Sequence, residues 1–184
     1  GKVSHAYLFV GPRGCGKTSV ARILAHEVNG FKYEIEDNYV DIIEIDAASN
    51  NGVDEIRELR TKVSLVPAEL KYKVYIIDEA HQLTRAAWDA SLKLIEEPPL
   101  SAIFIFCTTN IEKIPKTILS RVQTFQFRRV DTETIFDRLQ FIMNEEFPDK
   151  KYELDALKRI AILSDGHVRD SIKLLDKCLD ASDS

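Results

Sequence analysis

A glycine-rich stretch near the start of the chain has the residue types and the spacing that hold a chain of phosphates. The sequence GPRGCGKTSV, residues 11–20, contains the pattern G-x-x-x-x-G-K-[ST]. Its glycines allow backbone N–H groups to curl around an anion, and the helix that follows directs the positive end of its dipole to the same place. The pattern therefore predicts a site for the phosphates of a nucleotide.

Two side chains of this stretch have separate roles in the predicted site. We expect Lys17 to reach the β- and γ-phosphates and the Thr18 hydroxyl to ligate Mg²⁺. The other loop residues are expected to surround the phosphates, chiefly with their backbone, and they are Gly11, Pro12, Arg13, Gly14, Cys15, Gly16 and Ser19. Cys15 is interpreted as a loop residue without chemistry of its own.

A second acidic signal follows an apolar strand pattern in KVYIIDEAH, residues 73–81. An acid at the carboxyl end of a parallel strand faces the crevice in which open α/β sheets bind their ligands. We expect Asp78 to hold Mg²⁺, directly or through water, and Glu79 to polarise the attacking water. His81 is interpreted as a structural residue. An intact glutamate here favours a hydrolase over a protein that only binds nucleotide.

Strand patterns alternate with helical periodicity over the first 130 residues. The continuous apolar runs 6–10, 74–78 and 102–107 are typical of strands covered on both faces, whereas 40–46 and 122–127 alternate and suit positions nearer an edge. The helical segments are 17–28, with Val20, Ile23, Leu24 and Val28 on one face, then 53–63 and 84–96. This alternation predicts an α/β fold with a mostly parallel, five-stranded sheet.

The rest of the chain shows helical periodicity alone. Asp131 can cap the first helix, and Gly166 can close the second. The three apolar stripes are Ile135, Leu139 and Ile142, then Leu154, Leu157, Ile160 and Ala161, then Val168, Ile172, Leu175 and Leu179. We therefore predict a nucleotide-binding α/β domain over residues 1–130 and a small three-helix domain over residues 131–184.

Composition and charge exclude several classes of protein. The 184 residues carry a net charge of -5, which argues against strong stand-alone nucleic-acid binding but leaves room for a local basic strip. No apolar run approaches the roughly 18 residues of a membrane span, and no signal-peptide pattern opens the chain. Cys15, Cys107 and Cys178 are scattered and form no Cys-x-x-Cys pair, so we expect reduced thiols, a cytoplasmic protein and no zinc site.

Three further segments carry a resemblance to a known family. They are IEIDAASNNGVDEIREL (43–59), LIEEPPLSAIFIFCTTNIEKIPKTILSR (94–121) and GHVRDSIKLLD (166–176). In this order, and together with the phosphate loop, they resemble the AAA+ clamp-loader ATPases and within them the gamma/tau family of bacterial DNA polymerase III. The resemblance covers nearly the whole chain. It implies a P-loop NTPase fold of the AAA+ type with a helical lid domain, and ATP as the nucleotide.

The resemblance assigns sensor roles to two residues. Thr109 in CTTN aligns with the sensor that hydrogen-bonds the γ-phosphate or the lytic water, with Thr108 and Asn110 as neighbouring alternatives. Arg169 matches the second sensor, an arginine of the helical domain that contacts the γ-phosphate of its own site. Nucleotide state could then set the angle between the two domains.

Arg121 in LSRV matches the arginine finger of the family, which completes the ATP site of a neighbouring subunit rather than its own. Such a finger contributes a factor of about 10³–10⁵ to the rate. The family usually has a cysteine after this arginine, and here Val122 takes its place. Because the arginine is the functional part of the motif, Val122 does not change the assignment of Arg121 as the finger.

Two other departures from the family bear on what this chain can do alone. A four-cysteine zinc module usually lies between the first helix and the second strand, but residues 27–41 contain no cysteine. The family also carries an adenine-pocket segment before the first strand and a collar domain at its carboxyl end, and we expect this chain to lack both. In isolation it should therefore be a monomer with weak nucleotide affinity and little ATPase activity.

The resemblance implies an ATP-hydrolysing motor subunit that works with other clamp-loader subunits to place a ring-shaped sliding clamp on primer-template DNA. Arg85, which opens RAAWDASL, is our candidate for a DNA phosphate contact. One alternative is a non-hydrolysing, stator-like subunit, against which Lys17, Thr18 and Glu79 argue. The other is a different AAA+ DNA machine, such as a branch-migration motor or a helicase loader, which the segments EEPP and TILSR disfavour.

Overall fold

The computed structural model describes residues 3–34, 39–63 and 65–182. The described residues form two compact units. One contains the residues up to Val10 and Lys17–Gln126, and the other contains Gly11–Gly16 and the residues from Phe127 onward. The glycine-rich loop predicted to hold phosphates therefore groups with the helical part of the chain, whereas Lys17 and Thr18 group with the sheet.

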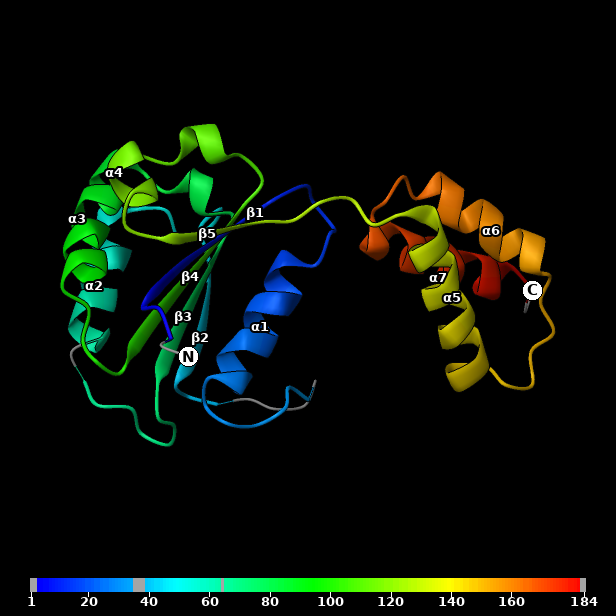
Figure 1. Cartoon of the computed structure of the whole chain (residues 1–184), viewed down its shortest axis with the longest axis horizontal. Coiled ribbons are helices and arrows are strands. Elements are labelled where there is room, and N and C mark those ends of the chain that lie inside the picture. The colour runs from blue at the N-terminus through cyan, green and yellow to red at the C-terminus, as the bar shows by residue number, and fades with distance from the viewer. Residues whose placement is uncertain (1–2, 35–38, 64, 183–184) are drawn as a thin grey trace. The chain divides into compact units, whose positions relative to one another are not determined.

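The first unit is built on a sheet of five parallel strands (Figure 1). The strand order is β2-β3-β4-β1-β5, so the two alternating segments of the sequence form the edges, as predicted. The strands are β1 (Ala6–Val10), β2 (Ile42–Asp46), β3 (Lys73–Asp78), β4 (Ala102–Thr108) and β5 (Gln123–Gln126). Their carboxyl ends share one edge of the sheet because all neighbours are parallel.

The burial of the strands follows their place in the sheet. Every residue of β1 and β4 is buried, whereas all four residues of β5 are exposed. The inner strands pack large side chains in layers, with the rings of Tyr75 and Phe104 stacked at a centroid distance of 5.4 Å. The long apolar runs of the sequence are thus explained by helices that cover both faces of the sheet.

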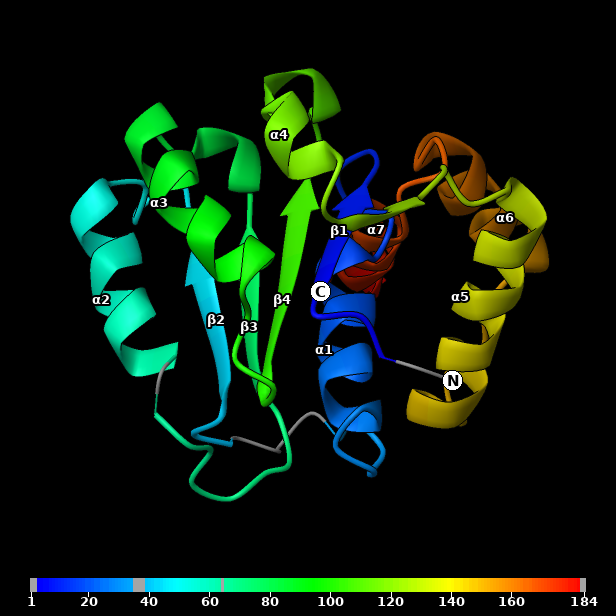
Figure 2. The ribbon, with the colours of Figure 1, turned by 60° about the vertical axis from the view of Figure 1, so that its left-hand side comes forward.

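Helices lie on both faces of this sheet (Figures 1 and 2). α1 (Lys17–Glu27) covers one face, and α2 (Val53–Val63) and α3 (Arg85–Glu96) lie side by side on the other. The Thr84 hydroxyl caps α3 by accepting a hydrogen bond from the backbone N–H of Ala87. The short elements beyond the carboxyl edge are the 3₁₀ turns η1 (Ala80–Gln82) and η2 (Ile111–Lys113) and the helix α4 (Lys116–Leu119).

The face that α1 buries differs from the prediction. Val20 and Ile23 are 39% and 43% exposed, while Ala21 and Ala25 are fully buried. Small side chains let the helix backbone approach a neighbouring element closely, and they contribute little to a pattern read from large apolar residues. Val20 and Ile23, which the sequence places on one face of the helix, are therefore exposed, and the helix is buried through its alanines.

The second unit contains α5 (Thr132–Glu146), α6 (Leu154–Leu163) and α7 (Val168–Ser182). Asp131 caps α5 as predicted, because its carboxylate accepts from the backbone N–H of Thr134. One stripe position differs from the prediction, because Leu154 is 50% exposed. Ile142 is partly buried against the core, and Met143, which was not predicted, lies within it. The buried core is Ile135, Leu139, Met143, Leu157, Ile160, Ala161 and Leu175.

A tight turn joins α6 to α7 and fixes the segment that enters the helical unit. Asp165 and Gly166 have φ values of 47° and 80°. A Cβ atom on Gly166 would lie 2.6 Å from the Cβ of Arg129, so a larger residue would clash as well as strain the backbone. The Gly166 carbonyl accepts from the N–H of Val130, and Arg129 forms an ion pair with Asp165.

Candidate nucleotide-binding site

The glycine-rich loop has backbone conformations that suit it to surround an anion. Gly14 and Gly16 have φ values of 75° and 93°, a region that favours glycine. A Cβ atom on Gly16 would meet nothing within 4 Å, so the loop is open at this position. The Cys15 thiol donates to the Pro12 carbonyl oxygen at 2.9 Å. The thiol therefore has a hydrogen-bond partner within the loop, and the interpretation of Cys15 as a residue without chemistry of its own stays a prediction.

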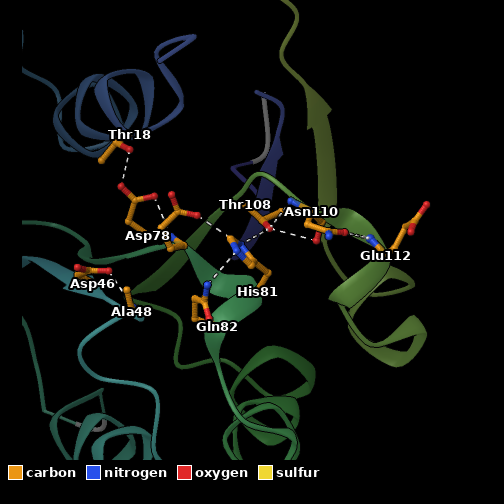
Figure 3. Close-up of polar contacts among 10 residues, drawn as sticks. Thr18, Asp46, Ala48, Asp78, His81, Gln82, Thr108, Asn110 and Glu112 are labelled. Atoms are coloured by element: carbon orange, nitrogen blue, oxygen red, sulfur yellow. Dashed lines mark hydrogen bonds and ion pairs between the residues drawn. The ribbon is translucent and has the colours of Figure 1, made fainter. Parts of the chain in front are cut away.

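The first turn of α1 presents the two side chains that the motif singles out. Lys17 is the first residue of the helix and only 7% exposed. The Thr18 hydroxyl donates to a carboxylate oxygen of Asp78 at 2.7 Å (Figure 3). The first turn of α1 and the end of β3 therefore place a hydroxyl and a carboxylate in direct contact.

The two acids at the end of β3 have different surroundings. The second carboxylate oxygen of Asp78 accepts from the backbone N–H of Glu79 at 2.8 Å, which holds the Asp78 side chain against the strand end. Glu79 has φ 48° and ψ 38°, a left-handed conformation that is uncommon for a residue with a side chain. Backbone of this kind costs about 1–3 kcal/mol and is found often at functional sites. This backbone conformation therefore supports the hypothesis that Glu79 has a functional role.

His81 lies beside Thr108, the last residue of β4 (Figure 3). Its Nδ1 atom is 3.3 Å from Glu79 Oε2 and 3.2 Å from the Thr108 hydroxyl oxygen. The Gln82 amide nitrogen lies 3.3 Å from His81 Nε2. If that amide donates, the ring carries its hydrogen on Nδ1, and the Thr108 hydroxyl oxygen is its acceptor. His81 thus links the acid at the end of β3 to a buried hydroxyl at the end of β4.

The three polar residues considered for the first sensor occupy different environments. Thr108 is fully buried and its hydroxyl donates to the Asn110 carbonyl oxygen, while Thr109 is exposed. The Asn110 side chain accepts from the N–H of Glu112 and caps η2. The assignment of this role to Thr109 stays a prediction, and Thr108 is the one of the three in contact with His81.

A third acid stands at the same edge of the sheet and was not singled out from the sequence. Asp46 ends β2 and pairs in register with Asp78 (Figure 3). The N–H of Ala47 donates to the Asp78 carbonyl oxygen at 3.0 Å, and the Asp46 carboxylate accepts from Ala48 at 2.9 Å. The sequence could have indicated Asp46, because the strand pattern VDIIEID, like that of β3, ends in an acid.

Arg169 lies beside the phosphate loop within the helical unit. Its backbone N–H points to the Gly14 carbonyl oxygen at 3.5 Å. A Cβ atom on Gly14 would lie 3.6 Å from the Cβ atoms of Arg169 and His167. The residue predicted to be the second sensor is therefore next to the loop predicted to hold the phosphates.

The other two predicted arginines sit at helix ends. Arg121 follows α4, and its Nε atom forms an ion pair with Glu96 at 2.8 Å. Its Nη1 atom donates to the Thr117 carbonyl oxygen at 2.7 Å and to the Ser120 hydroxyl at 3.0 Å. Arg85 is the exposed first residue of α3.

The three cysteines lie in different environments. Burial, followed by the nearby Asp78 carboxylate, raises the pKa of the Cys107 thiol far above its ordinary value, so this thiol stays protonated. Cys15 is buried and Cys178 is exposed. Within the described ranges, no three His, Cys, Asp or Glu side chains gather in a way that could hold a metal ion.

The residues present fit a magnesium nucleotide. Oxygen ligands are those that Mg²⁺ prefers, and the Thr18 hydroxyl and Asp78 carboxylate supply two of them 2.7 Å apart. Lys17 adds a cationic group one residue from Thr18.

None of the described helices is both long enough and apolar enough to cross a membrane.

Comparison with known proteins gives one family and several relatives. Residues 1–131 match the family described as DNA polymerase III, delta subunit. The tau subunit of DNA polymerase III from Bacillus subtilis is 46% identical over 195 aligned positions, which cover 98% of this chain and 34% of that protein. The tau subunit from Escherichia coli is 42% identical over 197 positions, covering 100% of this chain and 30% of that protein. The chain thus spans about a third of the length of these relatives.

Solved structures support the fold. The Thermotoga maritima RuvB Holliday junction branch migration motor has a TM-score of 0.74 and 22% identity, covering 96% of this chain and 54% of that one. A DNA polymerase III gamma subunit-related protein from Thermotoga maritima has a TM-score of 0.59 and 24% identity, covering 88% and 53%. The predicted P-loop NTPase fold of the AAA+ type is confirmed.

Proposed function

Because this chain belongs to the DNA polymerase III subunit family, with gamma and tau subunits among its relatives, we propose that it is the ATP-hydrolysing motor part of a clamp-loader subunit. In this proposal it acts in the cytoplasm with other subunits of the loader. ATP binding allows the assembly to grip and open a sliding clamp, and primer-template DNA triggers hydrolysis so that the clamp closes around the duplex.

The observation that carries the proposal is the contact between Thr18 and Asp78 with an intact Glu79 beside it. A protein that only bound nucleotide would need the first two groups but not the third. In the proposal, Thr18 and Asp78 hold Mg²⁺, and Lys17 holds the β- and γ-phosphates. When bound, Mg²⁺ neutralises charge on the phosphoryl oxygens.

Glu79 is the proposed general base. Its carboxylate orients a water molecule and takes up its proton. Thr109, or the neighbouring Thr108, would hydrogen-bond that water or the γ-phosphate. Arg169 would contact the γ-phosphate from the helical unit, a role supported by its position next to Gly14.

Arg121 is proposed to act in a neighbouring subunit. Its guanidinium is bound to Glu96, Thr117 and Ser120 of the first unit, at the end of α4. Its charge would stabilise the phosphoryl group as it transfers in the adjoining site. Isolated chains therefore have little activity in this proposal, since each ATP site needs a second protomer.

Arg85 is proposed to contact a DNA phosphate. It is exposed at the first turn of α3, in the same unit as Glu79. The net charge of -5 favours a local contact of this kind over a broad basic surface.

The direct test is phosphate release by the assembled loader built from the full-length protein, measured with and without sliding clamp and primed DNA. We expect hydrolysis that rises when clamp and primed DNA are both present. A matched assembly carrying Lys17→Ala should lose it. Release that is absent, or equal in the Lys17→Ala assembly, would instead support the stator-like alternative.

The same assembly also distinguishes the proposed clamp loader from the other alternative, a different AAA+ DNA machine. A different AAA+ DNA machine would hydrolyse ATP without any response to the clamp and would not retain the clamp in a pull-down. The structural likeness to RuvB, at 22% identity, concerns the fold and does not favour that reading.

A further inference from the structure

Glu96 and Arg121 form an ion pair between two elements that the sequence separates widely. Glu96 is the last residue of α3, and Arg121 follows α4. Arg121 Nε lies 2.8 Å from Glu96 Oε1, and the two side chains are 38% and 44% exposed. Ion pairs this exposed contribute little to stability, so a purely stabilising role does not account for the arrangement.

The contacts of Arg121 fix its orientation instead. Two hydrogen bonds from Nη1, to the Thr117 carbonyl oxygen and the Ser120 hydroxyl, hold one side of the guanidinium. The ion pair with Glu96 holds Nε. None of the hydrogen bonds among the described residues uses Nη2. A planar guanidinium held by Nε and Nη1 presents the Nη2 donors to a further acceptor in a defined direction.

Glu96 and Arg121 each lie close in sequence to a residue that is buried in the core of the first unit. Ile95, which precedes Glu96, is 7% exposed and packs in the core of the first unit. Ile118, in α4, is fully buried in the same core. A charged group that is held by well-packed elements keeps its geometry better than one on a mobile loop.

We propose that Glu96 is the positioning residue for Arg121, holding the guanidinium so that Nη2 meets the phosphates of ATP bound by a neighbouring copy. This inference rests on the proposed function, because it assumes that Arg121 acts across a subunit interface. Glu96 does not touch the nucleotide. It acts through Arg121 by removing the freedom of a long side chain before the subunits meet.

The test uses the assembled loader with full-length subunits carrying Glu96→Ala, Glu96→Gln or Glu97→Ala. Glu97 is an exposed acid next in sequence and serves as the matched control. We expect Glu96→Ala to lower kcat by about 10-fold, a part of the roughly 10³–10⁵-fold effect of a finger, with little change in KM for ATP. Glu96→Gln keeps an oxygen acceptor and should retain most activity, and Glu97→Ala should match the wild type.

A double substitution shows whether Glu96 affects kcat through Arg121 or independently of it. If Glu96 acts through Arg121, Glu96→Ala combined with Arg121→Ala will be no slower than Arg121→Ala alone. Additive losses, or a Glu96→Ala kcat equal to that of Glu97→Ala, would overturn the inference. Should Arg121→Ala itself leave kcat unchanged, the proposed function would fail rather than this inference alone. Unfolding midpoints of all variants, measured in parallel, identify any loss that comes from misfolding.

Discussion

Thr18 and Asp78, sixty residues apart in the sequence, are joined by a 2.7 Å hydrogen bond between a hydroxyl and a carboxylate oxygen. This contact ties the first turn of α1 to the end of β3. It places a hydroxyl oxygen and a carboxylate oxygen, the two groups proposed to hold Mg²⁺, next to each other. The remaining question is which groups bind the nucleotide and which hydrolyse it.

Substitution of Glu79 should separate nucleotide binding from hydrolysis. We expect Glu79→Gln in the assembled loader to lower the hydrolysis rate by about 10²–10⁴-fold, because an amide cannot accept the proton of the attacking water. ATP binding should persist, since the substitution leaves Lys17, Thr18 and Asp78 in place. Single-turnover hydrolysis and equilibrium nucleotide binding measure the two effects. A Glu79→Gln assembly that hydrolyses ATP at the wild-type rate would remove Glu79 from the mechanism.

His81 should influence hydrolysis through Glu79. Its Nδ1 atom lies 3.3 Å from the Glu79 carboxylate, so His81→Ala frees that side chain to leave its position. We predict a drop in kcat of about 10-fold with nearly unchanged nucleotide affinity, within the range expected when a catalytic group is mispositioned. Gln82→Ala, which removes a contact on the other ring nitrogen, is the comparison variant and should have a smaller effect. Equal rates for wild type and His81→Ala would show that the contact has a structural role alone.

Asp41 makes the stability of the chain depend on pH. Burial by itself raises the pKa of this fully buried carboxylate, but the backbone N–H groups of Glu69, Ala68 and Leu70, with the Lys73 charge, outweigh it and lower the pKa below 3.8. A lowered pKa in the folded state means that the carboxylate stabilises the fold above about pH 4. That contribution is lost as the pH falls through the folded-state pKa.

The corresponding prediction concerns Asp41→Asn. An amide has one acceptor oxygen for three donors, so the free energy of unfolding at pH 7 should fall by about 2–3 kcal/mol. The deficit should shrink as the pH is lowered below 4, because the wild type loses the same charge. Urea unfolding at a series of pH values measures this, with the exposed Asp137→Asn as control. A deficit that stays constant with pH would show that the charge of Asp41 is not what stabilises the fold.

Arg85 should contribute one phosphate contact. For the assembled loader, Arg85→Ala should weaken binding to primed DNA and reduce the slope of log K against log salt by about 1. Lys93→Ala removes the same charge from the last turn of α3 and should leave that slope unchanged. Titrations at several salt concentrations decide between them, and identical slopes for Arg85→Ala and wild type would exclude the contact.

Much of the architecture could be predicted because it depends on local pattern. The buried strands β1, β3 and β4 appear as continuous apolar runs, and the loop before α1 has a fixed spacing of Gly, Lys and Thr. Asp131 was predictable as a cap because capping needs only a short polar side chain at a helix start.

What could not be predicted depends on contacts between distant residues. The burial of α1 through Ala21 and Ala25 rather than Val20 and Ile23 depends on how closely a helix approaches its neighbours. The link from Glu79 through His81 to Thr108 joins two strands, and sequence spacing carries no sign of it. Glu96 was likewise visible only as one acid of EEPP until the fold brought it to Arg121.

The central claim is that each ATP site is completed by Arg121 of an adjoining subunit. The most direct measurement mixes two variants of the full-length subunit in the assembled loader: Lys17→Ala, which keeps Arg121 but loses its own site, and Arg121→Ala, which keeps its site but lacks the finger. Each variant alone should be nearly inactive, and their mixture should recover hydrolysis wherever a Lys17→Ala subunit presents Arg121 to an Arg121→Ala site. A mixture no more active than its two components, or an Arg121→Ala assembly with full activity, would contradict the account.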